Sequence, residues 1–412
     1  MLVAKYLDKI IRVGTLTVVD AHGKTHRFEG TEGPAVTVRL HDKALHWKLF
    51  FDPQLYAGEA FTDGNLTIVG GSIYDFLELV SMNMASVETP LVQRMALWGY
   101  KMARRLHQYN PARRARKNAA HHYDLSGQLY DLFLDADKQY SCAYFAGGND
   151  DLDTAQADKM RHIAAKLLLE PGHKVLDIGS GWGGLAIYLA REMGVDVTGL
   201  TLSEEQLKVA EASAREAGLE DRVRFKLRDY REETGSYDRI VSVGMFEHVG
   251  VNHFGTYFAK VRELLTDDGV MLLHTIGYMD GPSATDPWIR KYIFPGGYIP
   301  ALSEIAASME KTALWTTDIE VLRLHYADTM RHWRRRFLAR RADAEALYDE
   351  RFCRMWEYYL ACSEIGFRHL GNVVFQIQLA KRQEAVPLTR DYIARAWDGA
   401  KRSGRPSDRE AA

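Results

Sequence analysis

The chain has 412 residues, of which 46% are hydrophobic and 26% are charged, and its formal net charge is -2. This balance excludes a disordered chain, and the length favours one large domain with a smaller one beside it. No apolar run reaches the roughly 18 to 20 residues of a spanning helix, and the N-terminus lacks a signal-peptide pattern, so we expect a cytoplasmic protein. The cysteines Cys142, Cys353 and Cys362 have no C-x-x-C spacing, which argues against disulfides and against a metal site.

Positive charge is concentrated in two blocks. No Asp or Glu occurs between Glu88 and Asp124, a stretch that contains Arg94, Lys101, Arg104, Arg105, Arg113, Arg114, Arg116 and Lys117. The second block is interleaved with Trp333 and Phe337 and contains Arg331, Arg334, Arg335, Arg336, Arg340 and Arg341. One such block is more often a solvated helix face, but two of them favour contact with an anionic surface.

The first 90 residues predict a small β-rich domain. Residues 14–41 alternate between polar and apolar side chains in the manner of strands, and a further strand is expected at 66–69 after the turn at 63–65. A helix is expected over residues 73–85. Residues 91–120 lack the Gly and Ser of a flexible linker and predict a basic helical connector, and the polar tail at 401–412 is expected to be frayed.

Residues 121–400 predict a second domain, in which strands and helices alternate. Such alternation implies a parallel sheet with helices on both faces. Helices are expected over residues 186–193 and 204–217. The seven expected strands are residues 174–178, 196–200, 223–227, 239–243, 269–275, 317–322 and 373–379. The sequence thus predicts an α/β, Rossmann-like seven-stranded fold with a smaller β-rich N-terminal domain.

A glycine-rich segment, VLDIGSGWGG at 175–184, connects the first of these strands to the following helix. Glycines at this place let the backbone approach a ligand and present helix-terminal N–H groups to it. Dinucleotide dehydrogenases carry a similar loop, and a tight turn without a ligand is a further alternative. Asp177 before the glycines resembles the first motif of Rossmann-like methyltransferases, which bind S-adenosylmethionine. The second strand ends not in an acid but in TLSEEQ at 201–206, whose hydroxyls and amide can bind the ligand neutrally.

Seven short motifs occur in one order: HYDLS at 122–126, YSCAYF at 140–145, LDIG at 176–179, GLTLS at 199–203, FEH at 246–248, LHTI at 273–276 and IFPGG at 293–297. Together they resemble the cyclopropane-fatty-acyl-phospholipid synthase and mycolic acid cyclopropane synthase family over residues 115–385. The N-terminal module resembles that of the members acting on phospholipids. Ser180 departs from the family, since many members have Cys there.

The resemblance implies the site residues and the cofactors, S-adenosylmethionine and bicarbonate. The residues expected around S-adenosylmethionine are Tyr140, Ser141, Val175, Leu176, Asp177, Ile178, Gly179, Ser180, Gly181, Trp182, Gly183, Thr201, Leu202, Ser203, Gln206, Tyr230 and Arg231. The catalytic pocket, which would hold the bicarbonate ion, is expected to contain Glu247, His274, Tyr326, Cys142 and Ile276, the last two mainly through their backbones. Cys362 matches a family cysteine that is also assigned as active, although a buried helical cysteine is more often a small apolar residue.

The chemistry implied by the resemblance sets further expectations. An alkene is a weak nucleophile, so its attack on a sulfonium methyl requires alignment and a dry apolar tunnel. Closing a ring then needs a base, and an anion beside Glu247 is tolerated only if a proton is shared, so we expect a raised Glu247 pKa. The rings of Tyr144, Phe145 and Phe246 are expected to stabilise the cationic centres.

The leading hypothesis is an enzyme that forms cyclopropane rings on unsaturated phospholipid at the inner face of the membrane, associating with it peripherally. The family resemblance suggests a homodimer. One alternative is methyl transfer without ring closure, which gives methyl-branched or methylene chains. Others are methylation of a soluble metabolite, and a lipid-binding module with a decayed catalytic domain. Nucleic acid is not an expected partner, since the Asp/Asn-Pro-Pro-aromatic motif of amino-group methylases is absent.

Overall fold

The computed structural model describes residues 4–84, 94–95, 98–100, 102, 108, 127–147 and 151–402. Within these ranges, no helix combines the length and the apolar character that are needed to cross a bilayer. Several predictions fall outside the described residues: the HYDLS motif, most of the connector at 91–120, residues 403–412 of the tail, and the basic residues Lys101, Arg104, Arg105, Arg113, Arg114, Arg116 and Lys117.

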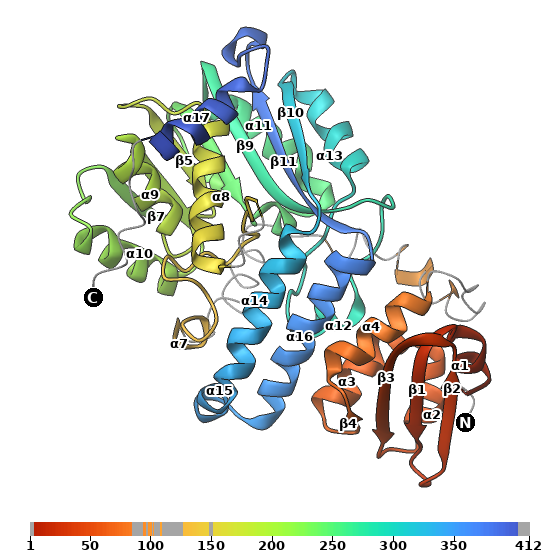
Figure 1. Ribbon diagram of the computed structural model, residues 1–412. Helices are drawn as coiled ribbons and strands as arrows, with labels where there is room; N and C mark the ends of the chain where they lie inside the picture. The colour runs from red at the N-terminus through yellow and green to blue at the C-terminus, as the bar shows by residue number, and fades with distance from the viewer. Residues whose placement is uncertain are drawn as a thin grey trace.

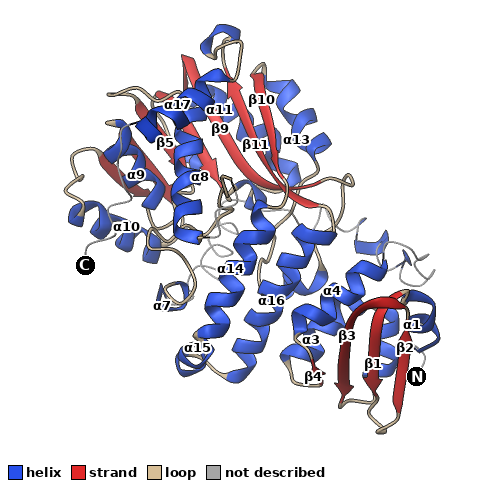
Figure 2. Cartoon of the chain, in the orientation of Figure 1, coloured by secondary structure: helices blue, strands red, loops and turns tan. Residues whose placement is uncertain are grey.

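A seven-stranded sheet forms the centre of the larger part of the molecule (Figures 1 and 2). Its strand order is β10-β11-β9-β8-β5-β6-β7, and β11 alone runs antiparallel to its neighbours. The strands are β5 Lys174–Ile178, β6 Asp196–Thr201, β7 Val223–Leu227, β8 Tyr237–Val243, β9 Leu265–Tyr278, β10 Trp315–Leu322 and β11 Asn372–Ala380. All seven predicted strands are present, and the Rossmann-like fold is confirmed. Only β9 is much longer than expected, because it continues through the turn-like residues 267–269.

Helices cover both faces of this sheet. Successive strand side chains point to opposite faces, so Val175 packs in a core with α9 while Leu176 packs in another core with α11. One layer contains α8 Leu152–Lys166, α9 Gly184–Met193, α10 Glu204–Glu216 and α17 Asp391–Arg402, and the other contains α11 Phe254–Leu264 and α13 Leu302–Met309. The carboxyl ends of β5, β6 and β8 open between these layers, where ligands bind in open α/β sheets.

The N-terminal part contains a four-stranded sheet of order β2-β1-β3-β4. Its strands are β1 Val13–Val19, β2 Thr25–Glu29, β3 Thr31–Leu40 and β4 Leu66–Gly70. Four helices accompany them: α1 Ala4–Ile10, α2 Leu45–Phe51, α3 Pro53–Thr62 and α4 Ile73–Met84. The region is therefore more helical than the sequence predicted. The Asp52–Pro53 pair, which reads as a turn, instead starts α3: Asp52 accepts a bond from the Leu55 amide, and proline occupies the first helical position.

An insertion between β10 and β11 connects the two parts. It contains α14 His325–Ala339, α15 Arg341–Leu347 and α16 Glu350–His369, and it reaches from the large sheet to the N-terminal helices (Figure 1). α16 packs on α3 and α4. Beside it, Gly58 of α3 packs against Trp288, a residue of helix α12 (Pro287–Tyr292). A Cβ on Gly58 would lie 2.5 Å from that ring. Glu59 Oε1 accepts bonds from Lys291 Nζ at 2.5 Å and Tyr292 Oη at 3.0 Å.

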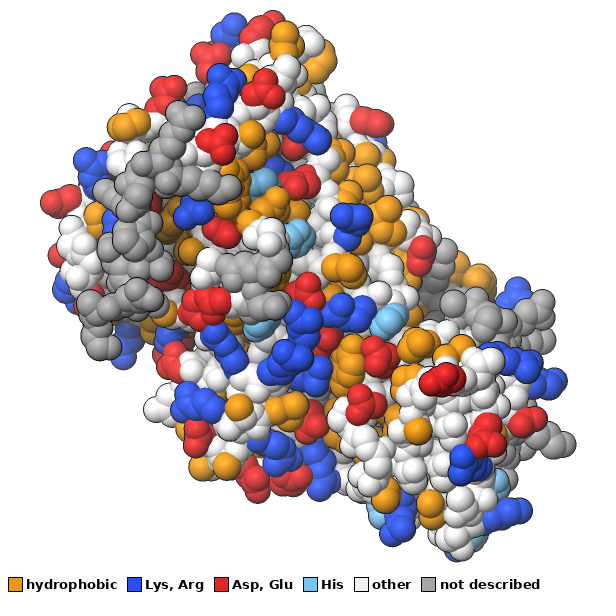
Figure 3. All heavy atoms as spheres, viewed as in Figure 1, with side chains coloured by type: hydrophobic (Ala, Val, Ile, Leu, Met, Phe, Trp, Pro, Cys, Tyr) orange, Lys and Arg blue, Asp and Glu red, His pale blue; other side chains and the backbone are white. Residues whose placement is uncertain are grey.

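The second basic block, on α14 and α15, does not form the predicted anion-facing surface. Trp333 and Phe337 are completely buried. Five of the six arginines pair with carboxylates of the chain: Arg331 with Asp328, Arg334 with Glu364, Arg336 with Asp153, Arg340 with Asp343, and Arg341 with Glu350. Figure 3 accordingly shows basic and acidic side chains mixed over this face. The spacing indicated an amphipathic helix correctly, but its apolar face packs inside the protein.

Candidate active site

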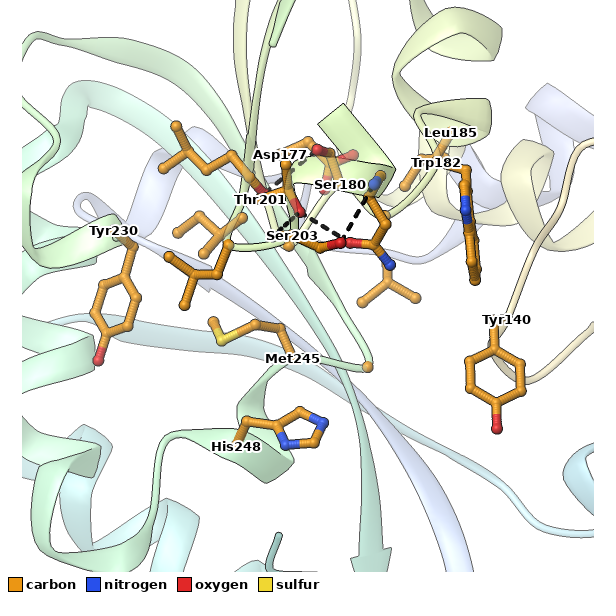
Figure 4. A pocket seen from close by; sticks show the side chains of 18 of the residues that line it. Tyr140, Asp177, Ser180, Trp182, Leu185, Thr201, Ser203, Tyr230, Met245 and His248 are labelled. Carbon is orange, nitrogen blue, oxygen red and sulfur yellow. Dashed lines mark hydrogen bonds between the residues drawn. The ribbon is translucent and has the colours of Figure 1, made fainter. Parts of the chain in front are cut away.

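A cavity lies at the carboxyl ends of β5, β6 and β8, around the glycine-rich loop (Figure 4). Gly179 has φ +89°, and a Cβ there would lie 2.8 Å from Met245 on the opposite wall. Gly183, also at φ +89°, starts α9 and would bring a Cβ within 2.6 Å of Phe225. Only glycine combines this backbone conformation with such close approach. The loop therefore places backbone amide groups beside the cavity.

Asp177 is a buried acid of this cavity. Its side chain is 1% exposed, and its Oδ2 atom has no hydrogen-bond partner among the described residues. Burial raises its pKa to about 7, although the nearby Lys159 ammonium acts in the opposite direction. A buried carboxylate oxygen without a donor is costly. Asp177 is thus suited to accept bonds from a cationic ligand group such as the ammonium of S-adenosylmethionine.

Lys159 stabilises two residues of the same cavity wall. Its ammonium is fully buried and donates to Gln139 Oε1 at 2.5 Å and to Ser141 Oγ at 3.0 Å. Burial lowers its pKa to about 8. Gln139 and Ser141 both line the cavity, so Lys159 holds two cavity residues in place.

The segment after β6 supplies neutral polar groups, as its sequence predicted. Thr201 Oγ1 donates to Gln206 Oε1 at 2.8 Å and accepts a bond from the Ser203 amide at 3.2 Å. Ser203 in turn caps α10 by accepting from the Gln206 amide. Figure 4 shows Thr201 and Ser203 beside the glycine loop. The backbone N–H of Gln206 is thus bound to Ser203, while Nε2 of its side-chain amide remains as a donor for a ligand.

Most of the predicted cofactor residues line this cavity, but Val175, Leu176 and Gly183 do not, because they pack within the sheet and at the start of α9. Arg231 lies at the cavity with both oxygens of Asp229 bound to its guanidinium, at 2.8 and 2.7 Å. The lining residues that were not predicted are Lys138, Gln139, Gly184, Leu185, Leu200, Arg228, Asp229, Val243, Gly244, Met245, His248 and Val249. The group at 243–249 follows β8 directly, so the rule that ligands bind beyond the carboxyl ends of strands would have indicated it.

A second, larger cavity lies next to the first. It contains about 3380 Å³ of empty space, its opening included. All six residues predicted as catalytic line it: Cys142, Glu247, His274, Ile276, Tyr326 and Cys362. Its far walls are apolar and include Leu16, Val18, Val38, Leu40 and Leu66 from the N-terminal sheet. The two cavities share Tyr140, Ser141, Gly244 and His248, so they meet beside the glycine loop.

Two buried polar atoms without partners among the described residues belong to side chains that line this second cavity. Glu247 Oε1 accepts a bond from the Ile276 amide at 2.6 Å, while Oε2 has no partner among the described residues. Burial raises the Glu247 pKa to about 7, as expected. His274 Nδ1 contacts Gln376 Nε2 at 3.1 Å, and its Nε2 also lacks a partner within the described part. Burial lowers the pKa of His274 to about 3, so the ring is neutral.

The remaining predicted catalytic residues have distinct environments. Cys142 is fully buried, and its Sγ donates to the Ala143 carbonyl at 3.3 Å. The Cys362 thiol donates to the Tyr359 carbonyl at 3.3 Å. Burial raises the pKa of both thiols. Neither cysteine is therefore a thiolate at neutral pH. The Ile276 amide, expected at the anion, is already bound to Glu247.

The prediction for Tyr144, Phe145 and Phe246 is wrong, because none of the three lines either cavity. Tyr144 stacks on the rings of His162 and His325, with centroids 4.3 and 4.8 Å apart, and Phe145 stacks on His325 and His332. Phe246 is buried against aromatic residues of α11. The aromatic residues that do line the two cavities are Tyr140, Trp182, Tyr230, Phe294, Tyr298, Tyr326, Tyr358, Tyr359 and Phe367, together with Trp98, Tyr100, Tyr278 and Phe76.

Comparison with known proteins agrees with this geometry. The family model of mycolic acid cyclopropane synthetase matches residues 110–377. A probable fatty acid methyltransferase of Pseudomonas putida is 36% identical over 90% of this chain and 94% of its own length. The cyclopropane-fatty-acyl-phospholipid synthase of Escherichia coli K12 is 44% identical over 64% of this chain and 67% of its own length.

Solved structures extend the comparison. The cyclopropane synthase MmaA2 from Mycobacterium tuberculosis is 33% identical, with a TM-score of 0.62 over 66% of this chain and 99% of that chain. A mycolic acid cyclopropane synthase in complex with SAH and CTAB is 31% identical, with the same TM-score of 0.62 over 66% of this chain and 98% of that chain. The chain belongs to the mycolic acid cyclopropane synthetase family and is an S-adenosylmethionine-dependent methyltransferase of lipids.

Proposed function

We propose that this enzyme converts the cis double bonds of phospholipid acyl chains into cyclopropane rings, with an enzyme-bound bicarbonate ion as the proton acceptor. The observation that carries the proposal is the junction of the two cavities. The first has the glycine loop and buried acid suited to S-adenosylmethionine, and the second is apolar, large and lined by all six predicted catalytic residues. A methyl donor in one and an acyl chain in the other would meet at Tyr140 and Ser141.

The apolar cavity supports an acyl chain as its occupant. From Glu247 and His274 it continues to the inner face of the N-terminal sheet, where Leu16, Val18 and Leu40 line it. Burial of a methylene group in such surroundings contributes about 0.8 kcal/mol. A long acyl chain would therefore bind through the summed burial of its methylene groups, with its double bond beside Glu247 and His274.

The opening of the cavity supports a membrane lipid as the source of that chain. Met84, Trp98 and Leu370 line the cavity and are also 49%, 66% and 40% exposed. Exposed tryptophan and aliphatic side chains beside basic residues are typical of proteins that lie on a lipid surface. In the sequence, Trp98 stands between Arg94 and the basic residues that follow up to Lys117. We propose peripheral docking there, rather than through α14, whose arginines are mostly paired.

Methyl transfer requires the chain to align a weak nucleophile and to exclude water. S-adenosylmethionine, when bound, supplies an electrophilic sulfonium methyl group. Tyr140 and Tyr359, whose hydroxyl oxygens lie 2.8 Å apart, line the apolar cavity where it meets the first one. The thiols of Cys142 and Cys362 stay protonated and do not compete with the alkene for the methyl group.

Two side-chain atoms of the chain support the proposed anion site. Glu247 Oε2 and His274 Nε2 are buried polar atoms with no partner among the described residues, and both side chains line the cavity. Buried polar atoms normally have hydrogen-bond partners, so these two are suited to bind a polar ligand. A bicarbonate ion held there would accept a proton from the added methyl group. Protonated Glu247, neutral His274 and the Tyr326 hydroxyl can each donate a hydrogen bond to such an anion.

A second candidate function is methyl transfer without ring closure. It is favoured by the relative from Pseudomonas putida, named a probable fatty acid methyltransferase, which matches nearly the full length of this chain. The same cation would lose a neighbouring chain proton to leave a methyl-branched alkene, or would undergo a 1,2-hydride shift and then lose a proton of the added methyl group to leave a methylene branch. The cavity geometry is compatible with both outcomes, so the test must identify the product.

The test uses vesicles of monounsaturated phospholipid and S-adenosylmethionine with a trideuterated methyl group. Ring closure removes one methyl deuteron, so we expect product lipids that have gained CD₂ and lost the double bond. Retention of all three deuterons, or of a double bond, would favour the second candidate. Free monounsaturated fatty acid and vesicles of fully saturated lipid are the controls. Absence of labelled lipid from the unsaturated vesicles would overturn the proposal.

A further inference from the structure

Gln376 and His274 are direct partners on adjacent antiparallel strands. The register of β11 and β9 pairs these two residues, so their side chains lie on the same face of the sheet. Gln376 is completely buried and His274 is 2% exposed. The amide nitrogen Nε2 of Gln376 lies 3.1 Å from Nδ1 of the imidazole ring. The other ring nitrogen is directed away from this contact, on a side chain that lines the apolar cavity.

The chemistry of the contact fixes the proton on the ring. A side-chain amide nitrogen only donates hydrogen bonds, so Nδ1 must offer its lone pair and cannot carry a hydrogen. In a neutral imidazole the remaining hydrogen is then on Nε2. Protonation of Nδ1 would place two N–H groups against each other at 3.1 Å. The contact therefore favours one tautomer and opposes the cationic ring.

A rotation of the amide by 180° would reverse this assignment, because the Gln376 oxygen would then accept from an Nδ1 hydrogen. The orientation in the structure leaves the oxygen Oε1 without a partner among the described residues. The reversed orientation would instead leave the two N–H donors of the amide unpaired in the same buried place. Unpaired buried N–H groups are rarer than under-used carbonyl oxygens. Burial lowers the pKa of His274. Of the titratable groups around it, Lys159, Lys166 and His162 lower that pKa further while Glu320 raises it, so the surroundings also oppose a cationic ring.

We propose that Gln376 is a positioning residue that holds His274 as the Nε2–H tautomer and so provides a hydrogen-bond donor to the anion beside Glu247. The role of this donor rests on the proposed function, whereas the tautomer does not. His274 would then donate a hydrogen bond to the anion beside those from protonated Glu247 and the Tyr326 hydroxyl. Gln376 would thus act on ring closure without touching the substrate.

The tautomer can be read directly in the wild-type enzyme by ¹⁵N NMR of protein labelled at histidine. The signals of His274 are assigned by their loss in His274→Gln. We expect Nε2 to carry the hydrogen and Nδ1 to show the shift of an unprotonated nitrogen, unchanged from pH 6 to 8. A hydrogen on Nδ1, or a ring that becomes cationic in this range, would overturn the proposal without reference to lipid or cofactor.

Two variants then test the positioning role. In its ionised form Gln376→Glu offers only acceptors, so at pH 8 we expect the hydrogen to move to Nδ1 and the calorimetric affinity for sodium bicarbonate to fall about 10-fold or more, the equivalent of ~1.4 kcal/mol. Gln376→Met removes the bond and should give a mixture of tautomers with a smaller loss. Gln378→Met is the matched control, because Gln378 is buried on the same strand but bonds to Lys166 O and Tyr392; the His274 signals should not move.

The outcomes separate this inference from the proposed function. Wild-type protein with the Nε2–H tautomer but no bicarbonate binding would refute the proposed anion, and with it the donor role of Gln376. Unchanged His274 signals in both Gln376 variants would overturn the positioning role even if the enzyme makes cyclopropane lipid. A variant that fails to fold leaves the wild-type spectrum as the deciding measurement.

Discussion

Replacement of Glu247 by glutamine should stabilise the protein, and most strongly at alkaline pH. Glu247 is 7% exposed, and burial raises its pKa from 4.5 to about 7 even though its Oε1 accepts the Ile276 amide hydrogen. The amide oxygen of glutamine can accept the same bond without carrying a charge. Glu247→Gln therefore removes a buried carboxylate and leaves the backbone contact in place.

The size of the effect follows from linkage between protonation and folding. A carboxyl group with a raised folded-state pKa binds its proton more tightly when folded, so its stabilisation is complete below about pH 4.5 and is lost as the pH rises to about 7. A shift of about 2.5 units corresponds to ~3 kcal/mol at pH 8, at ~1.36 kcal/mol per unit. The increase in the free energy of unfolding of Glu247→Gln over wild type should thus be about 2 kcal/mol larger at pH 8 than at pH 5.

Urea unfolding of both proteins at pH 5 and pH 8 measures this difference. Glu320→Gln is a control of opposite sign: burial opposes ionisation of Glu320, but His162 and Lys166 prevail and lower its pKa to about 2. Loss of the Glu320 carboxylate should destabilise the protein at pH 8, and this destabilisation should shrink as the pH falls toward about 2. Equal stability differences for Glu247→Gln at the two pH values would refute a buried, proton-binding Glu247.

Three further substitutions test the site and the domain contact. Asp177→Asn should weaken S-adenosylhomocysteine binding at least about 10-fold by calorimetry, because a charge-assisted bond contributes ~1.5 kcal/mol or more; unchanged affinity would exclude Asp177 from the cofactor site. Cys362→Ala should retain most of its methyl transfer to vesicles, since burial raises the thiol pKa, and loss of transfer in a folded variant would establish a catalytic cysteine. Gly58→Val should clash with Trp288, cost about 1–3 kcal/mol of stability and lower the activity on vesicles. Gly255→Ala, which meets no neighbour within 4 Å, should cost no stability. Equal unfolding midpoints for the two variants would contradict the contact between Gly58 and Trp288.

The parts of the fold and site that were predictable are those in which local sequence determines local structure. The β5 strand, the glycine loop and α9 follow one another without interruption, so the position of Asp177 at the cavity could be inferred from neighbouring residues. The same holds for Thr201 at the end of β6. The residues around the second cavity come from distant segments, and only the ordered motifs of a known family pointed to Glu247, His274 and Tyr326 together.

The failed predictions concern side-chain direction and tertiary partners. Phe246 is adjacent to Glu247, yet a single turn directs one ring into the α11 core and the other side chain into the cavity. Tyr144 follows the cavity residue Cys142 by two positions, but it stacks on His162 of α8. Arg334, Arg336 and Arg341 of α14 and α15 pair with acids on α8 and α16. None of these contacts has a signature in composition, periodicity or spacing.

The choice between ring closure and a methyl branch should depend on the protonation of Glu247. The other groups at the anion site remain neutral near pH 7: burial lowers the pKa of His274 to about 3 and raises that of the Cys142 thiol. Glu247, with a pKa of about 7, changes charge in this range. Above it, the carboxylate repels an anion and can no longer donate a bond to one, so the ratio of cyclopropane to uncyclised product should fall as the pH rises from 6 to 9. Added bicarbonate favours the protonated carboxyl and should move this decline to higher pH. A product ratio that is constant with pH and bicarbonate would mean that the proton is accepted elsewhere in the cavity.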